Sequence, residues 1–301
     1  MREPAVIRML PDGRRLHLHD GPIDLVVEAF GPAESVRAAY GAGAARFVSV
    51  LDELCGDLTL LRQRAGAGPR RPEGPIARRM FEAVEPFAEE TFITPMAAVA
   101  GAVAEEILGA MVSAAELERA YVNNGGDIAL YFAPGRQWSV ALVDRPDKPS
   151  LFGRAILRAE DGIRGIATSG WRGRSFSLGI ADAVTVLGET AARADAAATI
   201  VANAVDLPGH PAIERIEARE ISPDSDLGDL RVTRGVGALE ADEIQKALAR
   251  GLDQAERLRA TGLIRAAALR LGGETRVTSE VAEGAALFAG DPLRERSVLH
   301  A

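Results

Sequence analysis

The sequence is poor in cysteine, lysine and aromatic residues. It contains one cysteine, Cys55, and two lysines, Lys148 and Lys246, and aromatic residues make up 5% of the chain. A single cysteine excludes an intramolecular disulfide and a cysteine-rich zinc site. Because Cys55 lies in a helical pattern, we expect it to be a small buried residue. The net charge of −8 and the lack of a basic stripe exclude a nucleic-acid partner.

Long hydrophobic runs are also missing. The longest apolar run covers residues 95–104 and is shorter than the ~18 residues that suggest a membrane span. Residues 1–8 show no hydrophobic signal segment. The 301 residues are 47% hydrophobic and 26% charged, which is an ordinary globular composition. We therefore expect a cytoplasmic protein with no membrane partner.

Hydrophobic periodicity predicts a mixture of helices and strands. A weak echo between 96–100 and 196–200, both small-residue helices flanked by strands, suggests an internal repeat. We predict one α+β domain over 1–301 with two interleaved α+β repeats, roughly 1–145 and 146–280, and mostly antiparallel sheets. The tail 280–301 is left unassigned. The expected strands lie within 6–30 and at 117–122, 127–132, 138–143, 165–168, 181–188, 213–220, 230–236 and 262–278, and the expected helices at 33–64, 76–87, from 94 onward, around 195, and at 240–260.

The helix around residue 195 carries a narrow polar stripe. Asp195, Thr199 and Asn203 are spaced i, i+4, i+8 and share one face of an otherwise apolar helix. A buried carboxylate is costly without a partner, and Mg²⁺ prefers such oxygen ligands. The alternative is a core aspartate that bonds a nearby turn, with Thr199 bonding back to its own helix. The stripe alone favours neither interpretation.

The segment 123–127, Asn-Asn-Gly-Gly-Asp, joins two predicted strands. Asn and Gly tolerate positive φ, so a plain hairpin turn is the simpler interpretation. The functional alternative is that Gly125 and Gly126 let the backbone between Asn124 and Asp127 approach a ligand.

A second loop, 167–177, combines hydroxyl groups, glycines and arginine. Such a loop is suited to binding a phosphate or carboxylate, with Arg174 as the clamp, and the alternative is a solvated surface loop. Ser169 does not stand in a Gly-x-Ser-x-Gly elbow, so a hydrolase nucleophile is unsupported. His17 and His19 alternate on a predicted strand, where a solvent-facing pair is favoured over a metal pair. His210 follows the striped helix closely enough to lie near Asp195.

These motifs together resemble the ApbE-like superfamily, whose best-known members are FAD:protein FMN transferases. Those enzymes carry an Asn-x-Gly-Gly-Asp turn, a Thr-Ser-Gly loop and a late Ala-Asp-x-x-x-Thr helix whose Asp and Thr bind Mg²⁺. The corresponding segments here are 123–127, 168–170 and 194–199. The run 179–186, Gly-Ile-Ala-Asp-Ala-Val-Thr-Val, followed by Ala-Asp-Ala-Ala-Ala-Thr, is closer still to a cytoplasmic branch of that superfamily.

One departure from the flavin transferases bears on function. Their His-x-x-Asp-Pro-x-Thr-Gly segment is missing, because the interval between Gly170 and Ala181 is too short to hold it. The resemblance therefore implies the fold and the Asp–Thr pair that binds Mg²⁺. It does not support flavin transfer to a partner protein. Fold resemblance by itself does not supply a reaction.

We predict that the polar groups of these segments converge on one cleft. Asp195 and Thr199 are the predicted Mg²⁺ ligands, and Asp182 is the candidate catalytic group, with anchoring of a turn as its alternative. The predicted substrate-binding residues are Asn124, Gly125, Gly126, Asp127, Thr168, Ser169, Gly170, Arg174 and Ser177.

Three functions follow from this site. The leading one is a Mg²⁺-assisted enzyme acting on a small anionic or heterocyclic metabolite. The second is a flavin-related transferase or pyrophosphatase that uses FAD, and the third is a non-catalytic module that binds a small molecule. A second copy of the chain, in a homo-oligomer, is kept as a partner.

Overall fold

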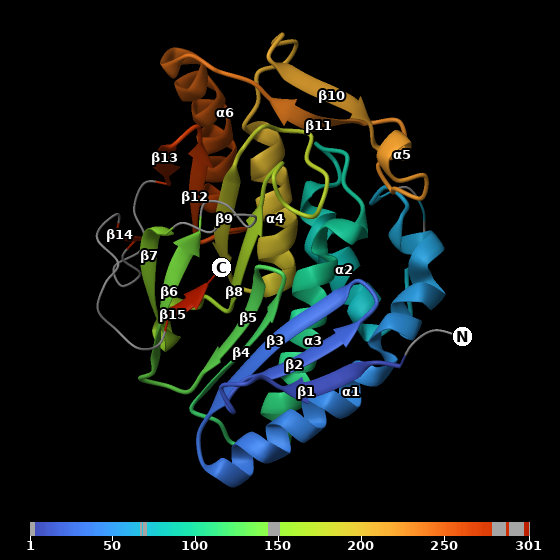
Figure 1. The fold of residues 1–301 in the computed structure, drawn as a ribbon, viewed down its shortest axis with the longest axis vertical. Helices are drawn as coiled ribbons and strands as arrows, with labels where there is room; N and C mark the ends of the chain where they lie inside the picture. Colours follow the sequence, from blue (N-terminus) through green and yellow to red (C-terminus); the bar gives the residue numbers. More distant parts are fainter. Residues whose placement is uncertain are drawn as a thin grey trace.

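The computed structural model describes residues 4–66, 68, 71–143, 151–278, 287–288 and 298–300. Its centre is a nine-stranded sheet in the order β1-β2-β3-β4-β5-β8-β9-β12-β13, in which all neighbouring strands run antiparallel (Figure 1). The strands are β1 Val6–Met9, β2 Leu16–Asp20, β3 Ile23–Phe30, β4 Arg119–Asn124, β5 Asp127–Phe132, β8 Gly165–Ser169, β9 Ala183–Gly188, β12 Ala266–Leu271 and β13 Glu274–Val277.

Helices cover one face of this sheet (Figure 1). The main core lies between the helices and the sheet, because the apolar residues of strands such as β2 alternate with polar ones: Leu16 and Leu18 are buried, whereas His17 and His19 face the other side. The helices are α1 Ala33–Leu61, α2 Pro75–Val84, α3 Val99–Ala114, α4 Ala191–Ala204, α5 Ala218–Ile221 and α6 Ala241–Ala260, with 3-10 turns η1 Glu85–Phe87, η2 Pro95–Ala98 and η3 Ala159–Asp161.

A four-stranded sheet, β14-β7-β6-β15, lies over part of the opposite face and encloses a second core around Trp138 and Leu157. A separate hairpin, β10-β11, follows α4. Among the described strand pairs only β15 and β6 run parallel. The bounds are β6 Gln137–Val143, β7 Leu151–Arg158, β10 Ile213–Glu217, β11 Arg231–Val236, β14 Leu287–Phe288 and β15 Val298–His300.

The same series of elements occurs twice along the large sheet. The first series is the β2-β3 hairpin, helices α1 and α3, and the β4-β5 hairpin; the second is the β8-β9 hairpin, helices α4 and α6, and the β12-β13 hairpin. In each series the two hairpins are neighbours in the sheet, through β3-β4 and through β9-β12. The predicted α+β class with mostly antiparallel strands is confirmed, whereas the predicted repeat bounds stay a prediction.

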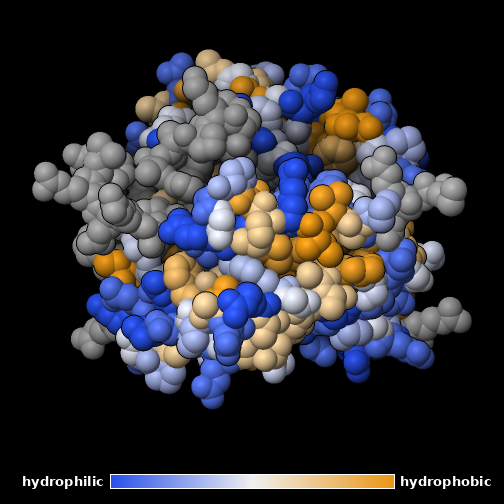
Figure 2. Space-filling view, turned by 60° about the horizontal axis from the view of Figure 1, so that its bottom comes forward, coloured by the Kyte–Doolittle hydropathy of each residue, from blue (hydrophilic) through white to orange (hydrophobic). Residues whose placement is uncertain are grey.

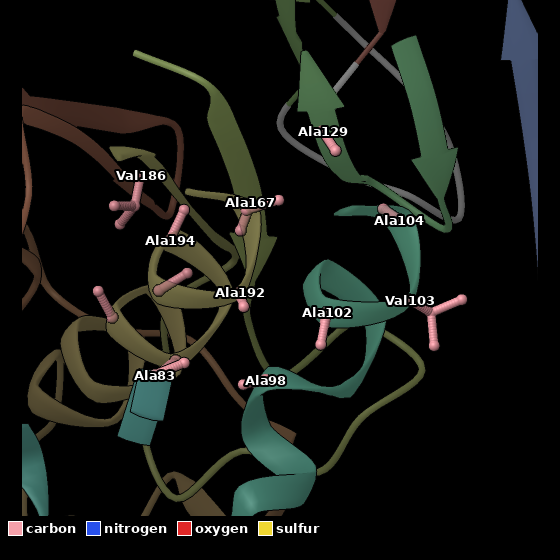
Figure 3. Close-up of a cluster of buried hydrophobic side chains, with 14 of the residues drawn as sticks. Ala83, Ala98, Ala102, Val103, Ala104, Ala129, Ala167, Val186, Ala192 and Ala194 are labelled. Atoms are coloured by element: carbon pink, nitrogen blue, oxygen red, sulfur yellow. The ribbon is translucent and has the colours of Figure 1, made fainter. Parts of the chain in front are cut away.

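Helices α3 and α4 lie side by side through small residues. Figure 3 shows Ala98 of η2 and Ala102 of α3 near Ala192 of α4. A Cβ atom at Gly101 of α3 would lie 2.3 Å from the carbonyl oxygen of Ala191, which only a glycine avoids. The alanine-rich composition of both helices is therefore a packing requirement, since it lets the two backbones meet.

Two expectations differ from the structure. Cys55 is exposed on α1, because its position falls on the face of α1 turned away from the sheet, so the prediction of a buried residue is wrong. The segment Pro95–Ala114 is 20 residues long and apolar enough to meet the length and composition of a membrane span, although Glu105 and Glu106 divide its apolar residues. In this fold it packs against α1, α2, α4 and the sheet, as a core helix does. The unassigned tail falls largely outside the described residues.

Candidate functional site

Asp195 projects from the first turns of α4 toward the beginning of α3. Its Oδ2 accepts a hydrogen bond from the backbone N–H of Gly101, at 3.0 Å, and the N–H of Ala100 also stabilises the carboxylate. Both donors belong to the first turn of α3, whose N–H groups have no partner within the helix. Asp195 therefore caps α3 from outside, which fits the alternative that it bonds nearby backbone.

Asp127 begins β5 and lies beside Asp195. Its Oδ1 accepts a hydrogen bond of 3.2 Å from the backbone N–H of Thr168 on β8. Thr168 turns its hydroxyl to the other face of the sheet, where it meets the hydroxyl of Thr185 at 3.0 Å. Thr168 thus binds Asp127 through its backbone N–H, not through its side chain.

The two carboxyl groups disfavour each other's ionisation. Burial raises the pKa of Asp127 to about 7, with the Thr168 N–H and Arg174 opposing the rise. Burial also raises the pKa of Asp195 well above its ordinary value, and the negative charge of Asp127 raises it further. A pair of enclosed like charges is stable only with a shared proton or a cation between them. We call Asp127 and Asp195 the two-carboxylate corner.

Arg174 lies over the turn that precedes Asp127. Gly125 and Gly126 adopt φ values of +67° and +114°, which residues with side chains rarely adopt. A Cβ atom at Gly125 would stand 2.7 Å from a terminal guanidinium nitrogen of Arg174. The exposed Arg174 guanidinium therefore lies against the turn, and its role as an anion clamp stays a prediction.

The backbone of the turn is held by its own side chains. The N–H of Gly126 donates to Oδ1 of Asn123 at 2.8 Å, and the Asn124 amide donates to the carbonyl of Ala100 at 3.2 Å. Asn124 is buried. These contacts fit the plain hairpin turn: the N–H of Gly126 is used within the turn, and Asn124 attaches the turn to the start of α3.

The rest of the stripe on α4 leads to a second contact. Thr199 is half-buried, one turn beyond Asp195 on the same face. The Oδ1 of Asn203 accepts hydrogen bonds from the hydroxyl of Ser177 and the N–H of Leu178. Ser177 is 2% exposed, and its bond to Asn203 holds the end of the 167–177 loop against α4. Its predicted contact with substrate stays a prediction.

Asp182 has both oxygens occupied. Oδ1 forms a 2.7 Å ion pair with Arg172, and Oδ2 accepts from the N–H of Gly272 at 2.8 Å. These bonds hold the 170–174 loop against the β12-β13 hairpin, which is the anchoring alternative. Ser169 ends β8 half-buried, and at Gly170 a Cβ atom would meet the carbonyl oxygen of Asp182 at 2.6 Å.

Glu105 on α3 was not among the residues singled out from the sequence. Its Oε1 accepts a 2.7 Å hydrogen bond from the N–H of Ala192 in the first turn of α4, and its other oxygen is 3.0 Å from Nε of Arg79. Burial raises its pKa. Glu105 thus caps α4 as Asp195 caps α3. The only sequence signal is an acidic residue one turn after Gly101 in an apolar helix.

The histidines lie outside this corner. His210 bonds Glu243 on α6 at 2.8 Å and accepts from the N–H of Ala212, so its proposed proximity to Asp195 has no support in its contacts. His17 and His19 each contact Asp24, at 3.2 and 3.1 Å, on the face of the sheet opposite the helices. Within the described residues no cluster of three or more His, Cys, Asp or Glu side chains is arranged to hold a metal ion.

Comparison with known proteins identifies relatives. A family model described as AbpE bacteria matches residues 7–277. The UPF0280 protein of Methanopyrus kandleri is 42% identical over 129 residues, covering 42% of this chain and 48% of the relative. That of Methanothrix thermoacetophila is 39% identical over 132 residues, covering 44% and 52%. The chain thus spans about half the length of these relatives.

Solved structures resemble the whole chain more distantly. The apo flavinyl transferase ApbE of Pseudomonas stutzeri has a TM-score of 0.43 at 13% identity, covering 92% of this chain and 96% of that one. The flavin transferase ApbE of Vibrio cholerae has a TM-score of 0.39 at 13% identity, covering 93% and 100%. Likeness at this level carries no conclusion about the activity of this chain.

Proposed function

This chain belongs to the AbpE bacteria family, and we propose that it is a cytoplasmic, Mg²⁺-assisted enzyme that acts on a small anionic or heterocyclic metabolite. The family match agrees with the resemblance found in the motifs. The observation that carries the proposal is the two-carboxylate corner, where Asp127 and Asp195 lie together with enclosed carboxyl groups.

The donor set of the corner fits Mg²⁺. Asp127 and Asp195 supply carboxylate oxygens, and Thr199 supplies a hydroxyl on the same face of α4. Mg²⁺ is commonly held by one or two carboxylates and completes its coordination with waters and substrate oxygens. Two carboxylates are therefore sufficient for a Mg²⁺ site, and a third acidic or histidine ligand is not required. When bound, the ion would polarise a substrate oxygen and neutralise developing charge.

The chain's own residues would position the substrate. Arg174 is exposed beside Gly125 and would hold a carboxylate or phosphate group through its planar guanidinium. Gly125 leaves the space that this guanidinium occupies. Asp127 would hold a proton near neutral pH in the absence of a cation, because its pKa is raised to about 7.

An activity screen tests the proposal. The purified chain would be incubated with phosphorylated and nucleotide metabolites, including FAD, with and without Mg²⁺, and products would be identified by mass spectrometry. We expect Mg²⁺-dependent turnover that Asp195→Asn abolishes and Asp253→Asn, which removes an exposed carboxylate on α6, preserves. FMN and AMP as the products would select the flavin-related alternative. Binding of a metabolite without turnover would select the non-catalytic module.

A further inference from the structure

The edge strand β1 ends the large sheet with its apolar side chains exposed. Val6, Ile7 and Met9 are 44%, 43% and 46% exposed, and among the described strands β1 pairs with β2 alone. They make up three of the six large hydrophobic side chains exposed among the described residues. Figure 2 brings the end of the molecule that carries α1 and β1 forward and shows hydrophobic surface gathered there. Such a concentration is typical of an interaction surface.

The strand is short and carries one charged residue, but a bulge, an internal proline and an acidic side chain are absent from it. Natural edge strands are blunted by charged side chains, bulges or internal proline. β1 pairs with β2 in an unbroken register from Val6 to Met9, and Arg8 is its only charged residue. Pro4 and Pro11 stand just outside it and limit its length.

The direction of the backbone groups follows from one hydrogen bond. Leu10 N–H donates to the carbonyl of Arg15 at 2.8 Å, and these residues continue the β1-β2 register. In an antiparallel ladder alternate residues bond to the same neighbour. Val6 and Arg8 therefore bond to β2, whereas Ile7 and Met9 direct their N–H and C=O groups to the open side.

We propose that β1 pairs antiparallel with β1 of a second copy of this chain, about a two-fold axis at Ile7. In this register Ile7 lies opposite Ile7 of the partner subunit, and Ala5 lies opposite Met9 of the partner subunit. Each of the three pairs exchanges two bonds, which gives about six backbone hydrogen bonds. Ala5, Ile7 and Met9 share the face of Leu16 and Leu18, so their side chains extend the helix-side core across the axis.

Other registers fit less well. A shift by one residue opposes side chains from different faces of the sheet. A shift by two residues places Arg8 opposite Arg8 of the partner subunit and brings Pro11, which has no N–H, opposite Ala5. In the register centred on Ile7 the charged Arg8 meets Val6, and Pro4 lies at a position that faces β2. The two-fold contact also closes at a dimer, whereas pairing of β1 with the far edge β13 would continue indefinitely.

Sedimentation velocity tests the dimer. We expect the full chain to sediment as a dimer at about 10–100 μM and the Ile7→Glu variant as a monomer that still unfolds in one cooperative thermal transition. Val277→Glu, which alters an equally exposed side chain on the other edge strand β13, is the control and should remain dimeric. A monomeric wild-type chain, including one that instead takes up a strand of another protein, would overturn the proposal. A dimer that survives Ile7→Glu would do the same.

Cross-linking tests the register. In a Cys55→Ser background, which removes the only native cysteine, oxidation of Ile7→Cys should give a disulfide-linked dimer. Directly opposed residues lie about 5.5 Å apart between Cα atoms, within disulfide range. Val6→Cys and Arg8→Cys, whose copies are displaced along the strands, should stay largely monomeric under denaturing conditions. Efficient cross-linking at position 6 or 8 with none at position 7 would refute the axis at Ile7.

Discussion

Glu105 and Asp195 occupy matching positions in the pair of central helices but have opposite electrostatic surroundings. Glu105 of α3 accepts from the first turn of α4, and Asp195 of α4 accepts from the first turn of α3. Burial raises the pKa of both carboxyl groups. Each is thus an external cap on the other's helix, where a negative charge is favourable.

The difference is the neighbour of each carboxylate. Glu105 has the guanidinium of Arg79 at 3.0 Å, whereas the charge beside Asp195 is the second carboxylate, Asp127. The comparison separates a cap that is paired with a cation of the chain from a cap beside which the described residues place no cation. A Mg²⁺ ion at the two-carboxylate corner would give Asp195 the counter-charge that Arg79 gives Glu105.

The largest expected effect comes from separating the two helices. Gly101→Ala would place a methyl group 2.3 Å from a backbone carbonyl oxygen of α4 and disturb both caps at once. We expect a loss of about 3 kcal/mol or more in unfolding free energy, measured by denaturant titration. Gly109→Ala on the same helix is the control, because its Cβ would meet no atom within 4 Å, and it should gain stability by about 0.5–1 kcal/mol. Equal effects at the two positions would show that the helices are not in close contact.

Exchange of each cap for its amide separates the two carboxylates directly. Glu105→Gln removes the charge that pairs with Arg79 and should cost about 2–3 kcal/mol of unfolding free energy. Asp195→Asn keeps an acceptor for Gly101 and relieves repulsion from Asp127, so we expect no loss in Mg²⁺-free buffer at pH 8. Chemical denaturation of both variants side by side is the measurement. A comparable loss in both variants would contradict the difference between the caps.

Loss of the Arg174 guanidinium should weaken ligand binding without affecting the cap. Arg174→Ala is expected to reduce the affinity for an anionic ligand of the corner by about 1.5–3 kcal/mol, the size of hydrogen bonds to a charged group. Isothermal titration calorimetry measures it, with Arg234→Ala, which removes an exposed arginine of β11, as the control. Unchanged affinity in Arg174→Ala would remove this residue from the site.

The smallest expected change, taken per pH unit, is a dependence of folding stability on pH. The pKa of Asp127 is raised from 3.8 to about 7 in the folded chain. Between these values the folded chain keeps a proton that the unfolded chain has lost. In the absence of a cation, folding stability should therefore fall as the pH rises through this window, by up to about 1.4 kcal/mol per pH unit. Asp127→Asn should flatten the dependence, and an identical pH profile in this variant would contradict the raised pKa.

The local features of the fold and the site were predictable from the sequence. Spacing alone placed Asp195, Thr199 and Asn203 on one face of a helix, and the Gly125-Gly126 turn follows from residue types that tolerate positive φ. The small residues of α3 and α4 also indicated buried helices in close contact. These features depend on neighbours within one or two turns of the chain.

The remaining parts depend on contacts between distant segments. Glu105 and Ala192 are 87 residues apart, so no local pattern identifies the cap on α4. The ion pair of Asp182 with Arg172 is local, but its second bond reaches Gly272 on the far hairpin. Cys55 occupies a helical position that periodicity alone does not orient relative to the sheet. Which face of α1 is covered is decided by tertiary packing.

Mg²⁺ binding to the metal-free chain tests the central claim most directly. Calorimetric titration at pH 8 would compare the wild-type chain with Asp195→Asn and with the surface control Asp253→Asn. We predict about one Mg²⁺ bound per chain in the wild type and the control, and at least a tenfold loss of affinity in Asp195→Asn. Absence of Mg²⁺ binding in the wild type, or equal binding in Asp195→Asn, would show that the two-carboxylate corner is not a cation site.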